Sequence, residues 1–177
     1  MSVLSDHSLR LLYPDAESVG PASIDLHLGD TLLWWPDWIT RDPRVDQSGS
    51  WRELTTSYAI GDDWAWVLEP GTRYLGVTRE RIEIRPDCAG QIGARSSWGR
   101  DGLAVIQGPA GWCDPGYEGH PTLELSVIGS RLIVWPGAAI CQLIIHRLTT
   151  PCEQPYRGRY QGDAEPVSSR LHLETAR

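Results

Sequence analysis

Short segments in which apolar and polar residues alternate recur along this chain of 177 residues. These alternating segments are residues 24–28, 64–68, 82–84, 123–127 and 132–134. A period of two is typical of strands with one buried face, whereas the more continuous apolar run at 140–148 indicates a more fully buried strand. Turn sequences such as Glu-Pro-Gly and Asp-Pro-Gly separate the segments. The pattern predicts an all-β domain.

Helix is expected in two short places only. Near the N-terminus Ser5 can cap a helix that Pro14 ends, and three leucines form its apolar face: Leu9, Leu11 and Leu12. A second short helix is expected near 96–101, where Ser96 can act as the cap.

Two segments depart from the regular pattern. Residues 36–63 are irregular, polar and rich in Trp, and we expect a long loop or hairpin excursion there. Residues 155–177 form a tail rich in Arg, Gly, Tyr and Ser, which either closes over a site or is mobile. Similarity between 68–76 and 134–142 suggests two similar hairpin units. The length fits one domain over residues 1–177.

Composition narrows the class of function. The chain is 41% hydrophobic and 22% charged, as expected of a globular protein, and its net charge is −7. It contains no Lys, so a Walker lysine, a Schiff base and a lysine general base are excluded. The negative charge disfavours nucleic acid as a partner. We expect the nine Trp residues to fill the core or a subunit interface rather than to stack on bases.

Location and metal content follow from what the sequence lacks. The first ten residues have charges and no apolar region typical of a signal peptide, and the longest apolar run is far too short to cross a membrane. We therefore expect a cytoplasmic protein with no membrane partner. The cysteines form no CxxC pair, which disfavours a zinc site. We expect these cysteines to be small hydrophobic residues buried in the core. They are Cys88, Cys113, Cys141 and Cys152.

The polar residues that could perform chemistry gather between 95 and 124. Arginine suits forked contacts with phosphate, and a strand carboxylate such as Glu124 can act as a general base for water. Each residue also has a plain structural explanation: Glu124 on a solvated strand face, Asp114 in a Pro-Gly turn. Asp25, inside an apolar strand, demands a partner such as an arginine. Together they indicate a site for hydrolytic chemistry on an anionic substrate.

Taken together, these motifs resemble the deoxycytidine triphosphate (dCTP) deaminase branch of the dUTPase-like superfamily. The most specific are Arg-Ser-Ser-Trp-Gly-Arg at 95–100 and Asp-Pro-Gly-Tyr-Glu-Gly-His-Pro-Thr-Leu-Glu at 114–124. The resemblance implies a β-clip fold, a distorted barrel, assembled as a homotrimer with active sites between subunits. It also implies zinc-free hydrolytic deamination of dCTP to dUTP, with Mg²⁺ accompanying the phosphates.

The resemblance also implies a role for each matching residue. Glu124 is the expected general base. Ser96 and Arg100, contributed by a neighbouring subunit, are expected to position the attacking water, and the Ala110 carbonyl is expected to orient this water. The residues expected to contact substrate are Arg95, Ser96, Ser97, Arg100, Asp114, Thr122, Leu123, Glu124, Gln142, Tyr156, Arg159, Gln161 and Asp163.

Three alternatives to dUTP formation remain open. Residues 110–114 look like the longer loop of a subgroup that also hydrolyses the product, giving dUMP and pyrophosphate. A dUTPase and a non-catalytic nucleotide-binding trimer are further alternatives. Asp163 stands where relatives usually have a phosphate-contacting Gln, and a carboxylate there should repel a triphosphate unless it faces away or binds through Mg²⁺. A modified cytosine nucleotide or a monophosphate also remains open as the substrate.

Overall fold

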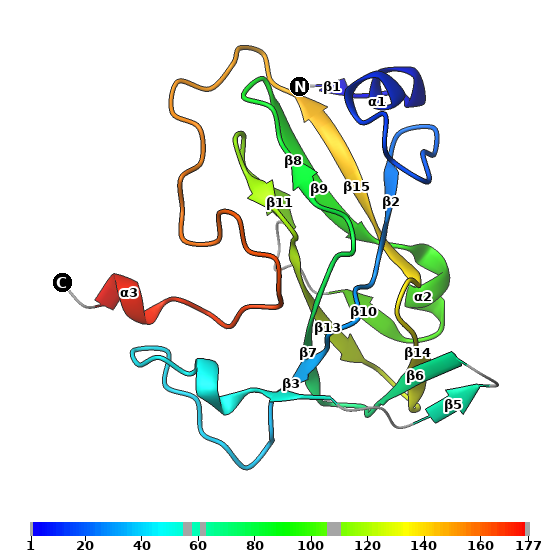
Figure 1. The fold of residues 1–177 in the computed structure, drawn as a ribbon, viewed down its shortest axis with the longest axis vertical. Helices are drawn as coiled ribbons and strands as arrows, with labels where there is room; N and C mark the ends of the chain where they lie inside the picture. Colours follow the sequence, from blue (N-terminus) through cyan, green and yellow to red (C-terminus); the bar gives the residue numbers. More distant parts are fainter. Residues whose placement is uncertain (1, 55–57, 61–62, 106–110, 176–177) are drawn as a thin grey trace.

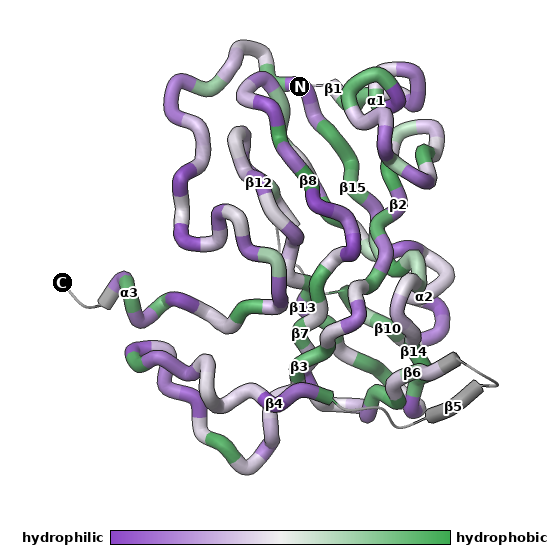
Figure 2. The backbone as a smooth tube through the Cα atoms, in the orientation of Figure 1, coloured by the Kyte–Doolittle hydropathy of each residue, from purple (hydrophilic) through white to green (hydrophobic). Residues whose placement is uncertain are grey.

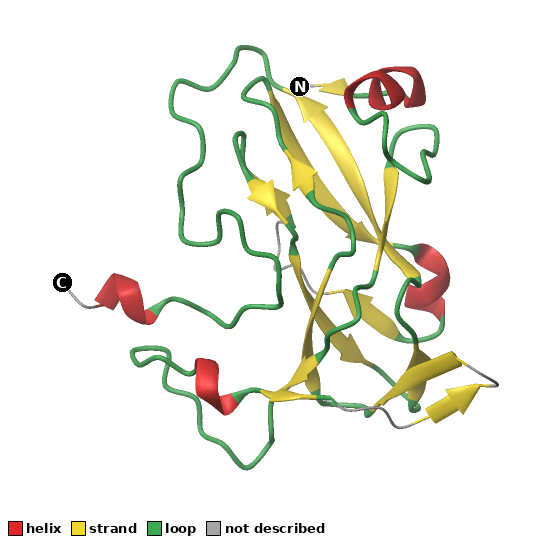
Figure 3. Cartoon of the chain, viewed as in Figure 1, coloured by secondary structure: helices red, strands yellow, loops and turns green. Residues whose placement is uncertain are grey.

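Antiparallel strands dominate the computed structural model, which describes residues 2–54, 58–60, 63–105 and 111–175 (Figure 1, Figure 3). The all-β class is therefore confirmed. The strands are β1 (Ser2–Val3), β2 (Ile24–His27), β3 (Leu33–Trp34), β4 (Arg52–Glu53), β5 (Tyr58–Ile60), β6 (Asp63–Leu68), β7 (Arg73–Val77), β8 (Ile82–Glu83), β9 (Cys88–Ala94), β10 (Leu103–Val105), β11 (Trp112–Cys113), β12 (Glu118–Gly119), β13 (Thr122–Val127), β14 (Leu132–Val134) and β15 (Ala139–Arg147). The helices are α1 (Asp6–Leu12), α2 (Ser96–Arg100), α3 (His172–Thr175) and the 3-10 helix η1 (Ser48–Ser50).

One sheet is built around β15, the long apolar strand expected from the sequence. β9 pairs with one edge of β15, and β1 and β2 share its other edge, while β11 extends the sheet beyond β9. Figure 2 shows β15 as hydrophobic along much of its length, in contrast to the polar tail that follows it. The register places Gln142 opposite Asp25 of β2.

A second sheet, in the order β10-β13-β7-β3-β4, carries the polar strand face that the alternation predicted. Leu123 and Leu125 of β13 are fully buried, whereas Thr122 and Glu124 face the other side and are partly exposed. Directly opposite residues of antiparallel strands share a face. The pairing of Glu124 with Leu75 therefore places this stretch of β7 beside the polar face of β13. In the described part of the chain the sheets stay open and form no closed barrel.

The expected pair of hairpins is wrong. The first strands of the two similar segments pair with each other, Leu68 of β6 opposite Leu132 of β14, in the sheet β14-β6-β5. The strands after the two Pro-Gly turns, β7 and β15, belong to different sheets. Gly71 and Gly137 both have positive φ, a conformation that glycine adopts readily, so each turn directs the chain from one sheet to another.

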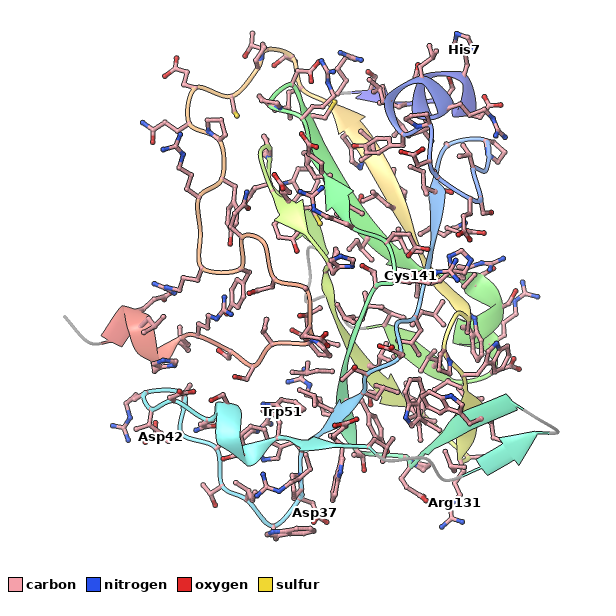
Figure 4. All side chains as sticks on the ribbon, in the orientation of Figure 1. His7, Asp37, Asp42, Trp51, Arg131 and Cys141 are labelled. Atoms are coloured by element: carbon pink, nitrogen blue, oxygen red, sulfur yellow. The ribbon has the colours of Figure 1, made fainter. Side chains whose placement is uncertain are left out.

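The core reflects the predicted pattern with local corrections. In α1, Leu9 is fully buried but Leu11 is 70% exposed, and Ser5 makes no side-chain cap hydrogen bond. Among the tryptophans, Trp66 and Trp35 are buried, whereas four are exposed: Trp38, Trp64, Trp112 and Trp135. These four therefore lie outside the core of the single chain, and the other expected place for them, a subunit interface, stays a prediction. All four cysteines are free thiols, and Cys141 lies in the interior (Figure 4).

The excursion at 36–63 contains more structure than expected, since η1, β4 and β5 lie within it. β4 pairs with β3 and so attaches the excursion to the second sheet. The tail after β15 runs down one side of the molecule and ends at α3, near the excursion (Figure 1). No helix in the described residues is long and apolar enough to cross a membrane.

Candidate active site

A cavity of about 750 Å³ lies where the second sheet, the excursion and the tail meet. Its volume is in the range of small-molecule sites in proteins. The sheet contributes residues from β7 and β13, the excursion contributes 41–51, and the tail contributes 156–169. Five of the residues expected to contact substrate line it together: Asp114, Thr122, Glu124, Tyr156 and Asp163.

Glu124 presents its carboxylate to this cavity from a rigid central strand. Its Oε2 lies 3.3 Å from Nη2 of Arg73, and both side chains are 42% exposed. Residues on β13 and β7 that are diagonal neighbours on one sheet face can meet in this way when their side chains are long. The carboxylate is thus accessible to solvent and fixed at one oxygen.

The wall opposite the tail is aromatic and cationic. Trp35 and Trp51 pack edge to face with their ring centroids 4.9 Å apart, and the guanidinium of Arg41 lies over Trp35 at 5.5 Å from its centroid. Figure 4 shows Trp51 in the space between the excursion and the sheet. Such an arrangement combines an apolar surface with positive charge, which suits a ligand that has both a ring and anionic groups.

The turn after β11 docks the tail at the edge of the cavity. Gly116 has a φ of +89°, and a Cβ there would lie 2.6 Å from the Cβ of Pro155, so only glycine lets the tail approach this closely. The amide of Tyr156 donates to the Pro115 carbonyl at 2.7 Å. Burial, followed by the nearby charge of Asp114, raises the pKa of the Cys113 thiol to about 12. That thiol is therefore protonated at neutral pH and unsuited as a nucleophile.

Further hydrogen bonds hold the tail along the cavity. The amide of His120 donates to the Asp163 carbonyl at 2.8 Å, and the amide of Val167 donates to Oγ1 of Thr122 at 3.2 Å. The carboxylate of Asp163 accepts two hydrogen bonds from Arg170, each 2.9 Å long. Of the two expectations for the tail, the structure favours the one in which it lies against the site.

The remaining candidates occupy different places. Ser96, Ser97 and Arg100 are exposed on α2, and α2 does not line the cavity. Arg95 precedes α2, and its Nε lies 3.8 Å from Oδ1 of Asp25. That oxygen also accepts from Nε2 of Gln142 at 3.0 Å. The expectation that Asp25 requires a partner such as an arginine is therefore confirmed.

Three other candidates do not present a free side chain to the cavity. The Leu123 side chain is fully buried on the opposite face of β13, so a contact of this residue with substrate is left to its backbone and stays a prediction. Arg159 pairs with Glu174 at 2.5 Å. The side-chain oxygen of Gln161 accepts a hydrogen bond from the backbone amide of Glu118, and its side-chain nitrogen donates to the Gly116 carbonyl. Ala110 lies outside the described residues.

Several cavity residues are absent from the sequence-based set, notably Trp35, Arg41, Trp51 and Arg73. The density of Trp between 34 and 51 is the one sequence signal that could have pointed to this wall. In the described segments, no three His, Cys, Asp or Glu side chains gather in a way that could hold a metal ion.

Comparison with known proteins identifies the family. A family model described as dCTP deaminase-like matches residues 5–148. A protein of Persephonella marina is 36% identical over 97% of this chain and 98% of its own length. A protein of Methanopyrus kandleri is 35% identical over the full length of both chains, and one of Mycolicibacterium smegmatis is 39% identical over 90% of this chain and 86% of its own.

A solved structure has a similar fold. The crystal structure of 2'-deoxycytidine 5'-triphosphate deaminase from Agrobacterium tumefaciens superimposes on 81% of this chain with a TM-score of 0.60. The match covers 47% of that chain at 21% sequence identity, so it concerns the fold alone.

The relatives' names also correct one expectation. All three sequence relatives are named "dCTP deaminase, dUMP-forming", so the expectation of dUTP as the main product is wrong. The family model covers most of the chain, and the relatives cover nearly all of it. The chain therefore belongs to the dCTP deaminase-like family.

Proposed function

We propose that this protein converts dCTP to dUMP, removing the cytosine amino group as ammonia and releasing pyrophosphate. The observation that carries the proposal is the position of Glu124, an accessible carboxylate on the sheet floor of a nucleotide-sized cavity. The proposal is supported by relatives that share nearly the whole chain and are named for forming dUMP from dCTP.

In the proposed deamination, Glu124 acts as the general base. It accepts a proton from a water molecule as that water attacks C4 of cytosine, which gives a tetrahedral intermediate. It passes this proton to ring nitrogen N3, then takes the proton of the new C4 hydroxyl and delivers it to the amino group. The C4–N bond then breaks, so that ammonia leaves and the C4 carbonyl of uracil remains. A positioned general base typically contributes about 10²–10⁴-fold in rate. Burial raises the pKa of the Cys113 thiol, which makes this cavity thiol a poor alternative to water as the nucleophile.

The proposed active site is completed by a second copy of the chain in a homotrimer. Ser96 and Arg100 then come from the neighbouring subunit and hold the attacking water and the intermediate, and the Ala110 carbonyl helps to orient the water. Two observations support this arrangement. α2 does not line the cavity of its own chain, and in the described part of the chain the exposed Arg100 has no ion-pair partner. Arginine is suited to stabilise the developing negative charge.

Phosphate binding completes the proposal. Arg95, Ser97 and Gln142 of the neighbouring subunit, with tail residues Tyr156, Arg159 and Gln161, would hold the triphosphate, and Asp114 would accept from the sugar 3′-hydroxyl. Mg²⁺ would be held by the phosphates, since no group of three carboxylate, His or Cys ligands gathers in the described segments. Its positive charge would support the second hydrolysis, in which water cleaves the α–β phosphate bond and pyrophosphate leaves.

One assay tests the proposed reaction. Incubating the protein with dCTP and Mg²⁺ should yield ammonia, dUMP and pyrophosphate in equal amounts, as resolved by anion-exchange chromatography. Accumulation of dUTP alone would contradict the second hydrolysis. No turnover, with dCTP bound in isothermal titration, would indicate a nucleotide-binding protein without catalysis.

The role of Glu124 has its own test. Glu124→Gln removes the proton acceptor while keeping the side-chain shape, so we expect kcat for ammonia release to fall by at least about 10²-fold. Glu69→Gln is a matched control, because Glu69 also pairs with an arginine, Arg131, but does not line the cavity. If Glu124→Gln retains full activity, Glu124 is not the base.

A further inference from the structure

Arg73 is a charged residue inside the cavity to which the proposed chemistry assigns no role. It begins β7 and lies opposite Ser126 of β13, two pairs along from the opposing residues Leu75 and Glu124 and therefore on the same face of the sheet. Its guanidinium crosses diagonally to Glu124, with 3.3 Å between Nη2 and Oε2. Both side chains line the cavity.

The backbone that carries Arg73 is held firmly on both sides. β7 pairs with β13 along one edge and with β3 along the other. The next residue, Tyr74, is buried, and its hydroxyl accepts a hydrogen bond from the Glu69 amide at 2.8 Å. A long side chain on such a strand starts from a fixed point, which suits a role in positioning another group.

The two oxygens of the Glu124 carboxylate have different surroundings. Oε2 faces Arg73, whereas Oε1 has no hydrogen-bond partner within the described residues. Glutamate has three rotatable side-chain bonds, and an unanchored carboxylate would sample many directions. With one oxygen tied to Arg73, the other is left available for the attacking water.

From this geometry we infer that Arg73 is a positioning residue for the general base. It fixes Glu124 through Oε2 so that Oε1 points at the water. The inference rests on the proposed role of Glu124 and extends it to a residue on a neighbouring strand. Misplacing a reacting group by about 1 Å can cost on the order of 10²-fold in rate, so the ion pair affects catalysis far more than folding.

A contribution to stability alone is the competing explanation. Exposed ion pairs typically stabilise folded proteins little. The chain offers a comparison in Arg131 and Glu69, which pair at 2.8 Å with similar or greater exposure. Arg131 does not line the cavity, and Figure 4 shows it at the lower right of the molecule, away from Asp42 at the lower left. Breaking either ion pair should change stability to a similar small extent, whereas only the loss of Arg73–Glu124 should also lower catalysis. Comparing the two pairs therefore separates a positioning role from a contribution to stability alone.

The test compares Arg73→Met, Arg73→Lys and the control Arg131→Met in the full-length protein. We measure kcat and KM for ammonia release from dCTP, together with the melting temperature. Arg73→Met should lower kcat by about 10- to 100-fold with KM within about twofold. Arg73→Lys should recover most of the loss, because an ammonium can still hold Oε2. Arg131→Met should match the wild type. Arg73→Gln replaces Arg73→Met if the latter impairs folding.

The possible failures are distinguishable. An unchanged kcat in Arg73→Met, or a raised KM with kcat retained, overturns the positioning role; the second result would make Arg73 a substrate-binding residue. A parallel loss of melting temperature and activity, with no rescue by Lys, also overturns it. Failure of the wild type to release ammonia, or full activity of Glu124→Gln, would instead refute the proposed function on which the inference rests.

Discussion

Asp163 brings a negative charge to the edge of a cavity that we propose binds a triphosphate. The resemblance left open whether this carboxylate repels substrate, faces away or binds through Mg²⁺. In the structure the carboxylate forms a forked pair with Arg170, and the Arg170 guanidinium also lies over the ring of Tyr160 at 5.3 Å. A forked pair of this kind offsets the charge with defined geometry. Repulsion of the phosphates is thereby reduced without moving Asp163 out of the cavity.

Breaking that pair should impair substrate binding. Arg170→Gln leaves the Asp163 carboxylate uncompensated, so we expect KM for dCTP to rise about tenfold, the equivalent of about 1.4 kcal/mol of repulsion. The double variant Arg170→Gln, Asp163→Gln removes the unpaired charge and should return KM to within about threefold of wild type. Steady-state kinetics of the three proteins check this. No rescue in the double variant would show that Arg170 itself binds substrate or that the tail has moved.

Individual residues differ in how far the sequence predicted their surroundings. A partner for Asp25 could be predicted, because an acid in an apolar strand must be compensated. Arg73 could not be predicted as the neighbour of Glu124. The two residues are 51 positions apart in the sequence and meet only because of the register of β7 on β13. Gln161 could not be placed either, since its amide binds backbone groups of residues 116 and 118.

At the scale of elements, alternation located the long strands well. β13 buries the residues that its pattern indicated. β15 was expected to be more fully buried, but its burial alternates and Ile144 is only partly buried. Strands of two or three residues, such as β4 and β5, are too short for a period of two to be recognised, so residues 36–63 were expected to be irregular. Pairing partners were also beyond the sequence, which is why two similar Pro-Gly turns suggested hairpins where the chain passes between sheets.

The loops that form the cavity depend on tertiary contacts rather than on local pattern. The tail reaches the site through hydrogen bonds to residues 115–122 and through the close approach at Gly116. The excursion reaches it through the pairing of β4 with β3 and the packing of Trp51 on Trp35. Neither contact has a periodic signature. The sequence therefore indicated both segments as unusual without showing that they face each other across one cavity.

At the scale of the whole molecule, the candidate residues fall into two groups on one chain. The cavity group includes Glu124, and the α2 group includes Arg100. If every active site combines the cavity of one subunit with α2 of the next, a single chain holds two incomplete halves. A closed ring of three copies then contains three complete sites. Size-exclusion chromatography with light scattering should report a trimer.

Mixing two inactive variants tests the shared site directly. Glu124→Gln damages only the cavity half, and Arg100→Ala damages only the α2 half, so each homotrimer should be inactive. Co-expression in equal amounts gives mixed trimers in which about one quarter of the sites combine an intact Glu124 with an intact Arg100 from different chains. We therefore expect about one quarter of wild-type ammonia release. If both residues acted within one chain, every site would carry one defect and the mixture would stay inactive. Restored activity would thus require that the site is formed between subunits.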